Sequence, residues 1–127
     1  MRTIIDANMV LRYLLDDNEI QAELAEDVIV RGAYLPNEII AEAVYVLQKV
    51  YKIDRLTIAT LLSELFEIVA VDDRETVVYA LNKYASLNLD FADCLLIAYN
   101  RVQGRGVFTF DKKIKEQIGG RLAAAMK

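Results

Sequence analysis

The chain of 127 residues contains no histidine, one cysteine, Cys94, and one proline, Pro36. Without histidine there is no Ser-His-Asp triad, no Cys-His pair and no metal site that depends on imidazole. A single cysteine allows neither an internal disulfide nor a thiolate zinc cluster, and we interpret Cys94 as a small core residue. If the protein is an enzyme, its chemistry has to come from carboxylates, which are ligands of hard cations such as Mg²⁺.

Long apolar runs are also missing from the sequence. Every apolar stretch ends well short of the ~20 residues that a membrane helix requires, and the N-terminus does not resemble a secretory signal. Hydrophobic residues make up 55% of the chain and charged residues 27%, which predicts one folded domain over residues 1–127. We therefore expect a soluble, cytoplasmic protein with no membrane partner. The net charge of −4 disfavours broad electrostatic binding to nucleic acid unless a cation neutralises a local acidic pocket.

Hydrophobic periodicity predicts strands that alternate with helices. Strands are expected at residues 3–6, 33–36, 67–71 and 107–110. Helices are expected at residues 8–15, 19–31, 38–51, 53–66, 73–86, 90–101 and 112–118. This alternation is typical of an α/β fold with a central, mostly parallel sheet flanked by helices (α/β/α), whose ligands bind beyond the carboxyl ends of the strands. The final segment, "GGRLAAAMK", is expected to be a loose end or a short edge element.

Four aspartates fall at the expected carboxyl edge of this sheet. Asp6 follows the first strand and Asp111 follows the fourth, while Asp90 and Asp93 open the helix expected at 90–101. Each has a purely structural alternative, because Asp6 and Asp111 can cap the helices that follow, a role worth about 1 kcal/mol. Asp90 and Asp93 likewise fit a capping box. Taken one at a time, capping is the more frequent role, but Asp6 and Asp111 follow their strands without a turn residue, and Asp93 is followed by core residues.

Glu42 is harder to interpret from periodicity. It lies on one stripe of the helix expected at 38–51, with Glu38 and Tyr45, opposite a broad apolar side. A solvated stripe is the usual meaning of such a pattern. Glu38 and Glu42 form an i,i+4 pair of like charges, slightly unfavourable in water, which a cation would relieve. Periodicity alone favours a surface residue over a functional one.

The last expected helix is basic. It carries Lys112, Lys113 and Lys115 within four residues. A solvated face is the usual role of such a cluster, and contact with phosphates beside a neighbouring pocket is the alternative.

Four segments in order along the chain resemble one known family: "IIDANMVLRYLL", "IIAEAVYVL", "LDFADCLLIA" and "VFTFD". Together they resemble the PIN-domain ribonucleases, and most closely the VapC-type toxins of type II toxin–antitoxin pairs. The resemblance covers nearly the whole chain. It implies a single PIN-like domain that hydrolyses RNA phosphodiester bonds with Mg²⁺ or Mn²⁺.

The resemblance also implies roles for individual residues. The catalytic and metal-binding acids correspond to Asp6, Glu42, Asp93 and Asp111, and the supporting polar residues to Asn8, Thr109 and Asp90. Asp6 and Asp93 are expected to bind the metal directly or through water, and Glu42 to bind it or to orient the attacking water. Asp111 would complete the cage. Ala7 departs from the family pattern, which usually has a hydroxyl residue there, so one supporting hydrogen bond is lost.

The resemblance further implies two kinds of protein partner. One is an antitoxin that inserts an Arg or Lys among the acids, where a guanidinium can pair with carboxylates. The other is a second copy of the chain, and the many apolar residues at 38–66 predict a dimer or antitoxin surface there or on the first two helices. The alternatives are a housekeeping PIN nuclease in RNA processing and a non-catalytic binding module of the same fold. Metal-dependent cleavage of RNA separates both nucleases from the binding module.

Overall fold

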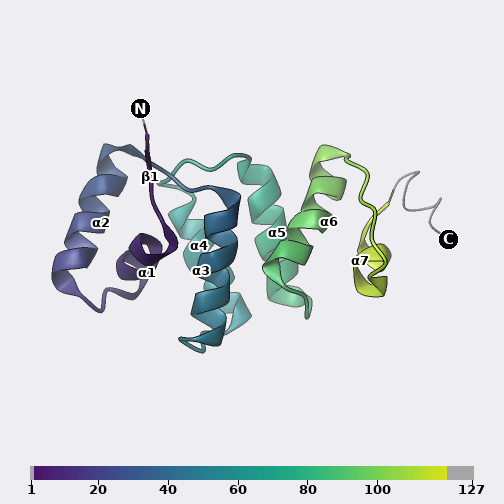
Figure 1. Cartoon of the computed structure of the whole chain (residues 1–127), viewed down its shortest axis with the longest axis horizontal. Coiled ribbons are helices and arrows are strands. Elements are labelled where there is room, and N and C mark those ends of the chain that lie inside the picture. Colours follow the sequence, from purple (N-terminus) through teal and green to yellow (C-terminus); the bar gives the residue numbers. More distant parts are fainter. Residues whose placement is uncertain (1, 120–127) are drawn as a thin grey trace. The chain divides into compact units, whose positions relative to one another are not determined.

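A computed structural model of the chain describes residues 2–119 and divides into two compact units, residues 1–72 and 73–127 (Figure 1). The first unit contains β1 (Thr3–Ile4), α1 (Ala7–Leu15), α2 (Glu19–Gly32), β2 (Ala33–Tyr34), α3 (Asn37–Lys49) and α4 (Arg55–Leu65). The second contains α5 (Arg74–Ser86), α6 (Phe91–Gln103) and α7 (Lys112–Gln117). Most of the segment expected to be a loose end, residues 120–127, lies outside the described residues.

The sheet of the first unit is parallel, as the sequence predicts. β1 pairs with β2 in the register Thr3 to Ala33 and Ile4 to Tyr34. On the other side of β2, a parallel bridge joins Tyr34 to Ala70, and the Ala70 N–H donates to the Ala33 carbonyl at 2.8 Å. The strand expected at 67–71 is therefore reduced to a single bridge. The connections between these parallel segments contain helices, which gives the α/β architecture that was expected.

The helices of the first unit bury one face each. α1 packs against both α2 and α3 (Figure 1). Gly32 ends α2 at a φ of 114°, a left-handed conformation that favours glycine, and the chain enters β2 directly. The side chains of the unit's core that are essentially excluded from solvent are Val10, Leu35, Ile40, Val44, Leu47, Ile58, Leu62 and Leu65. Full burial of one such side chain stabilises the fold by about 1.5–3 kcal/mol.

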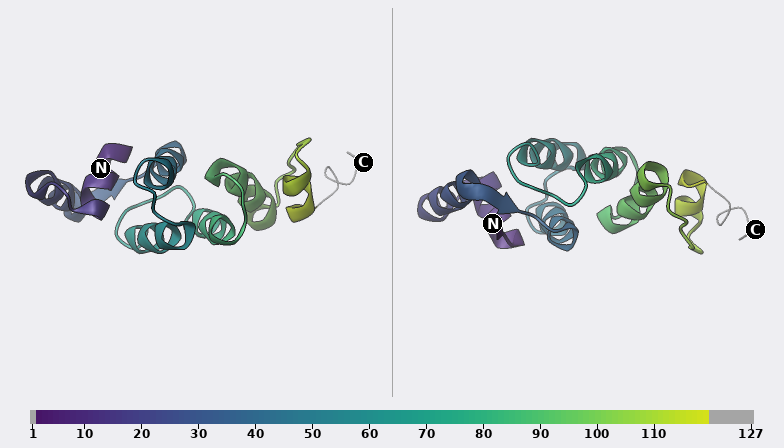
Figure 2. Two further views of the ribbon diagram at one scale, coloured as in Figure 1. Left: turned by 90° about the horizontal axis from the view of Figure 1, so that it is seen from below. Right: turned by 90° about the horizontal axis from the view of Figure 1, so that it is seen from above.

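The second unit is a helical hairpin with one further helix. α5 and α6 lie side by side in Figure 1 and in both views of Figure 2, and α7 contacts α6. Tyr84 of α5 meets Phe91 of α6 edge to face, with ring centroids 6.3 Å apart. Both rings are buried, so this contact anchors the start of α6 against the end of α5.

One buried side chain ties together the segments that follow α6. The Asn100 amide donates to the carbonyls of Arg105 at 2.9 Å and Gly119 at 2.8 Å, and its oxygen accepts from the Gly119 N–H at 2.9 Å. Gly104, at a φ of 70°, ends α6 in the left-handed conformation. Asn100 thus holds the chain at two points, one just after α6 ends and one just after α7 ends.

The fourth expected strand is absent from the described residues, because residues 107–110 form no strand pairing there. A strand exists only where its backbone pairs with a neighbour, and the described part of the second unit contains no strand. Val107 is buried, whereas Phe108 and Phe110 are exposed and meet each other edge to face, 5.4 Å between centroids. Within residues 2–119, no helix combines the length and apolar character needed to span a membrane.

Candidate metal centre

Asp6 caps α1 at the carboxyl end of β1. Its backbone is extended, with φ −93° and ψ 177°, and its carboxylate accepts a hydrogen bond from the Met9 N–H at 2.9 Å. The side chain is exposed, as is that of Asn8 in the next turn. A carboxylate offers about four lone-pair sites on two oxygens, so one capping bond leaves room for a cation. The capping role expected for Asp6 is confirmed, and it is compatible with a metal-binding role.

Glu42 lies on the exposed side of α3. Ile40, Ala43 and Val44 of this helix are buried, while Glu42 and Glu38 face solvent one turn apart. The stripe expected from periodicity is therefore confirmed. Like charges at i,i+4 repel each other slightly, so a cation near this stripe would be favourable.

Asp72 is an acid at the same edge that sequence analysis did not single out. It follows the bridge residue Ala70, and its carboxylate accepts a short hydrogen bond from the Tyr34 hydroxyl. This bond raises the pKa of Tyr34, with further contributions from burial and from the charges of Asp72 and Glu38. The signal was present in the sequence, because Asp72 follows its expected strand in the same way as Asp6 follows the first.

In the second unit, two aspartates act on the carboxyl group of a third. Asp93 is half-buried in the first turn of α6, and burial raises the pKa of its carboxyl, as do the charges of Asp90 and Asp111. A hydrogen bond from the Asp90 backbone N–H acts in the opposite direction and lowers the pKa of Asp93. Asp90 is the N-cap residue of α6, but its own side chain makes no capping bond. Of the two hydrogen bonds in the expected capping box, only the one from the Asp90 N–H to the Asp93 carboxylate is therefore formed.

Asp111 is held in place by two hydrogen bonds. Its carboxylate caps α7 by accepting from the Ile114 N–H at 3.0 Å, and its own N–H donates to the Thr109 hydroxyl, also at 3.0 Å. Thr109 therefore contacts Asp111 directly. The side chain of Asp111 is exposed, and its negative charge is one of the causes of the raised pKa of Asp93.

The donor chemistry of these acids suits a hard divalent cation. Neighbouring carboxylates raise one another's pKa, and a cation that pairs with them reverses that effect. Within the described part of either unit, no group of three or more acidic or cysteine side chains is positioned to hold a metal ion. The candidate acids Asp6 and Glu42 belong to the first unit and Asp93 and Asp111 to the second, so neither unit alone contains a complete metal cage.

The sequence profile of the PIN domain matches residues 3–118, from β1 to the residue after α7. The chain belongs to the PIN domain family. PIN domains are generally metal-dependent nucleases that use divalent metals, and a PIN nuclease domain implies an RNA substrate. No curated protein matches the chain in sequence. The match to the PIN domain includes Asp6, Glu42, Asp93 and Asp111, which belong to two different compact units.

Proposed function

We propose that this PIN domain is a metal-dependent endoribonuclease whose Mg²⁺ or Mn²⁺ is held by Asp6, Glu42, Asp93 and Asp111. The observation that carries the proposal is the state of Asp93. Its pKa is raised by burial and by two neighbouring acids, Asp90 and Asp111. A charge placed in such surroundings is unfavourable unless a cation accompanies it, and family membership supplies the nuclease chemistry.

In this proposal each acid has its own part, and that of Glu42 rests on the resemblance to the PIN-domain family alone. Asp6 and Asp93 bind the cation, and Asp111 presents its carboxylate from a position fixed by Thr109 and by the first turn of α7. Glu42 orients the water that attacks the phosphate. A bound divalent cation would lower the pKa of a water molecule that it coordinates, and it would offset the charge that develops on the phosphate. Because the chain has no histidine, a carboxylate or bulk solvent has to accept the proton from the attacking water.

We also propose that the nuclease acts as the toxin of a type II toxin–antitoxin pair and forms a homodimer. The support is the order and spacing of the four segments that resemble VapC-type toxins. A second support is the pair Ile20 and Leu24, which lie one turn apart on α2 and are both exposed. An apolar patch built from several such neighbours is typical of a surface that binds another protein. The antitoxin would place an Arg or Lys among the acids in place of the metal.

Cleavage of a defined RNA tests the nuclease proposal. The purified protein is incubated with labelled RNA in Mg²⁺, in Mn²⁺ and in excess chelator, and Asp93→Asn and Asp6→Asn are compared with Glu23→Gln. Glu23 is an exposed acid on α2, so its variant removes one charge outside the proposed site. We expect cleavage that requires metal and is lost in both aspartate variants but retained in Glu23→Gln. Cleavage that survives both substitutions, with melting temperatures unchanged, would refute the assigned site.

The toxin and dimer proposals have separate tests. Induction of the chain in a host should arrest growth, and co-expression of the gene beside it should restore growth. Sedimentation of the purified protein at micromolar concentration should give the mass of a dimer. A monomer that neither arrests growth nor binds the neighbouring product would refute the toxin role and leave the nuclease activity unaffected.

A further inference from the structure

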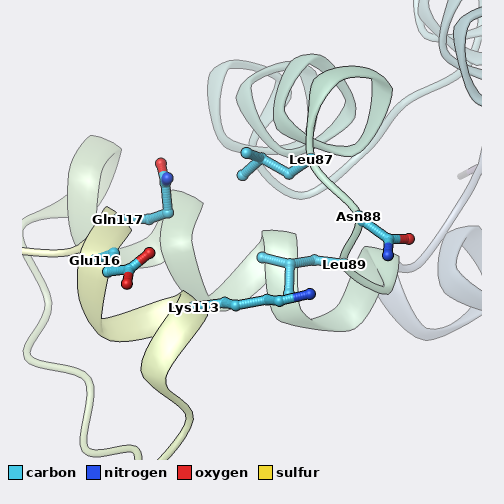
Figure 3. Close-up of a pocket in the computed structure, with 6 residues that line it drawn as sticks. All are labelled: Leu87, Asn88, Leu89, Lys113, Glu116 and Gln117. Carbon is cyan, nitrogen blue, oxygen red and sulfur yellow. The ribbon is translucent and has the colours of Figure 1, made fainter.

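The second unit contains a cavity that lies outside the proposed set of acids. Its volume is about 240 Å³. Three of its lining residues, Leu87, Asn88 and Leu89, come from the loop between α5 and α6, and the other three, Lys113, Glu116 and Gln117, come from α7 (Figure 3). We define these six residues as the loop–α7 cavity.

The loop–α7 cavity adjoins the acids of the second unit along the chain. Leu89 directly precedes Asp90, and Lys113 follows Asp111 by two residues. The two walls of the cavity therefore continue into the two segments that carry these acids.

The polar side chains of the cavity are available to a ligand. Among the described residues, no hydrogen bond or ion pair engages the side chains of Asn88, Lys113, Glu116 or Gln117. Figure 3 shows Glu116 and Gln117 on one side of the cavity, with the Lys113 side chain extending beside Leu89 toward Asn88. The cavity thus combines one cation, one carboxylate and two amides with apolar surface.

We propose that the loop–α7 cavity binds one nucleotide of the RNA next to the scissile phosphate and selects guanine. This inference rests on the proposed ribonuclease function. Pockets for drug-sized ligands have volumes of about 300–1,000 Å³, so a cavity of about 240 Å³ suits a single base or nucleoside. Apolar surface from the half-buried Leu87, with the buried Leu89 packed behind it, contacts the flat face of a base, while Lys113 pairs with a phosphate oxygen as a point charge.

The preference for guanine follows from Glu116. A carboxylate only accepts hydrogen bonds, and guanine is the RNA base that presents two adjacent donors, N1–H and the N2 amino group, on its Watson–Crick edge. Uracil presents one N–H donor between two carbonyl oxygens. Those oxygens and the Glu116 carboxylate would repel each other. The Gln117 amide, on the same side of the cavity as Glu116 in Figure 3, can donate to guanine O6 or N7 and can also accept, so it adds to the recognition but does not determine the base.

The test measures binding and cleavage separately on two short RNAs that differ only in one guanine replaced by uracil beside the cleaved bond. Binding is measured by fluorescence anisotropy in chelator, where a metal-dependent nuclease does not cut. Cleavage is measured by steady-state kinetics with Mg²⁺, which give KM and kcat. The variants are Glu116→Gln and Lys113→Gln, and Lys112→Gln is the matched control, because Lys112 is exposed and does not line the cavity.

Glu116→Gln should reduce the preference for guanine by roughly 5- to 150-fold, the discrimination of one good bidentate contact, because binding of the guanine RNA weakens and repulsion of the uracil carbonyls is relieved. Lys113→Gln should weaken binding of both RNAs alike and reduce the slope of log K against log salt by about 0.7. It should raise KM more than it lowers kcat. Lys112→Gln should change neither the base preference nor the ratio of KM to kcat.

The outcomes distinguish failure of the subsite proposal from failure of the nuclease proposal. Cleavage of both RNAs at equal rates, with all variants alike, would overturn the subsite and leave the nuclease proposal standing. Binding that prefers guanine and depends on Glu116, without any cleavage, would support the subsite and overturn the nuclease. Absence of both binding and cleavage by a protein with an unchanged melting temperature would overturn both.

Discussion

Replacing Asp73 by alanine tests whether this capping aspartate contributes to stability without contributing to cleavage. The sequence Asp-Arg-X-Thr occurs twice at a helix start, at Asp54–Thr57 before α4 and at Asp73–Thr76 before α5. In both, the threonine hydroxyl donates to the aspartate at 2.6 Å. The two differ in burial, because Thr76 is 0% exposed whereas Thr57 faces solvent. Gln103 of α6 also donates to the Asp73 carboxylate, at 3.1 Å.

The expected cost of Asp73→Ala is the sum of two effects. Loss of the cap costs about 1 kcal/mol. The buried Thr76 hydroxyl is left without the acceptor for its proton, which costs about 1–3 kcal/mol more. The total of roughly 2–4 kcal/mol corresponds to a fall in melting temperature of about 8–15 °C for a chain of this size. Asp54→Ala loses only a solvent-exposed cap and should cost clearly less.

The stability of Asp73 variants also depends on pH in a defined direction. The Thr76 hydroxyl, with further hydrogen bonds from Thr76, Gln103 and Glu75, lowers the pKa of Asp73. A lowered pKa in the folded state means that the stabilisation is present above the ordinary aspartate pKa of about 3.9 and is lost as pH falls through the lower folded value. The difference between wild type and Asp73→Ala in urea unfolding should therefore be constant near neutral pH and shrink in acid.

Two results would refute this reasoning. One is an equal loss of stability in Asp54→Ala and Asp73→Ala, and the other is a cost for Asp73→Ala that does not change down to pH 3. Metal-dependent cleavage per folded molecule should stay unchanged in both variants, because neither residue is among the proposed ligands. A loss of cleavage by correctly folded Asp73→Ala would mean that Asp73, like Asp6 and Asp111 in the proposed site, takes part in activity as well as in capping.

Four further predictions concern the second unit. Asp93→Asn should lower cleavage by at least roughly 10–100-fold, measured with Mg²⁺. The raised pKa of Asp93 means that the folded state loses stability as pH rises from the ordinary aspartate pKa of about 3.9 through the higher folded pKa. Without metal, Asp93→Asn should therefore be more stable than wild type in urea unfolding once the pH is above the ordinary aspartate pKa. Mg²⁺ or Mn²⁺ should raise the wild-type melting temperature and leave that of Asp93→Asn unchanged. Asn100→Ala removes three part-buried hydrogen bonds, two of them to Gly119, and should cost about 1–3 kcal/mol by the same unfolding assay.

The helices could be predicted from the sequence because their determinants are local. All seven expected helices are present in the described residues, with ends within a few positions of those expected. Side chains of Asp6, Asn18 and Asp111 cap the helices that follow them. Apolar spacing and a capping residue act over a few positions, so a single sequence contains the information.

The strands could be predicted less well because their partners are distant in the chain. The segment at 33–36 pairs on both sides, the segment at 67–71 contributes one bridge, and the segment at 107–110 pairs with nothing among the described residues. An apolar run shows that a segment can form a strand and does not show which neighbour it joins.

The candidate site could be predicted in part. The positions of Asp6 and Asp111 at helix starts followed from the ends of the expected strands. The pKa shift of Asp93 could not be predicted, because it depends on burial and on Asp111, eighteen residues further along the chain. Glu42 is exposed in a solvated stripe, so only its place in the family pattern distinguishes it from Glu38.

The hydrogen bonds of Asn100 have a consequence for how this segment can change in length. The amide group holds the chain at Arg105 and again at Gly119, so the stretch between them is a loop whose two ends are fixed. The free energy of closing a flexible loop grows only slowly with its length, by about 0.6 kcal/mol for each doubling. Residues inserted between Arg105 and Val107 would therefore lengthen the loop while α7 keeps its contact with α6. Related chains are free to differ here in length and composition, whereas a substitution of Asn100 would release both ends at once.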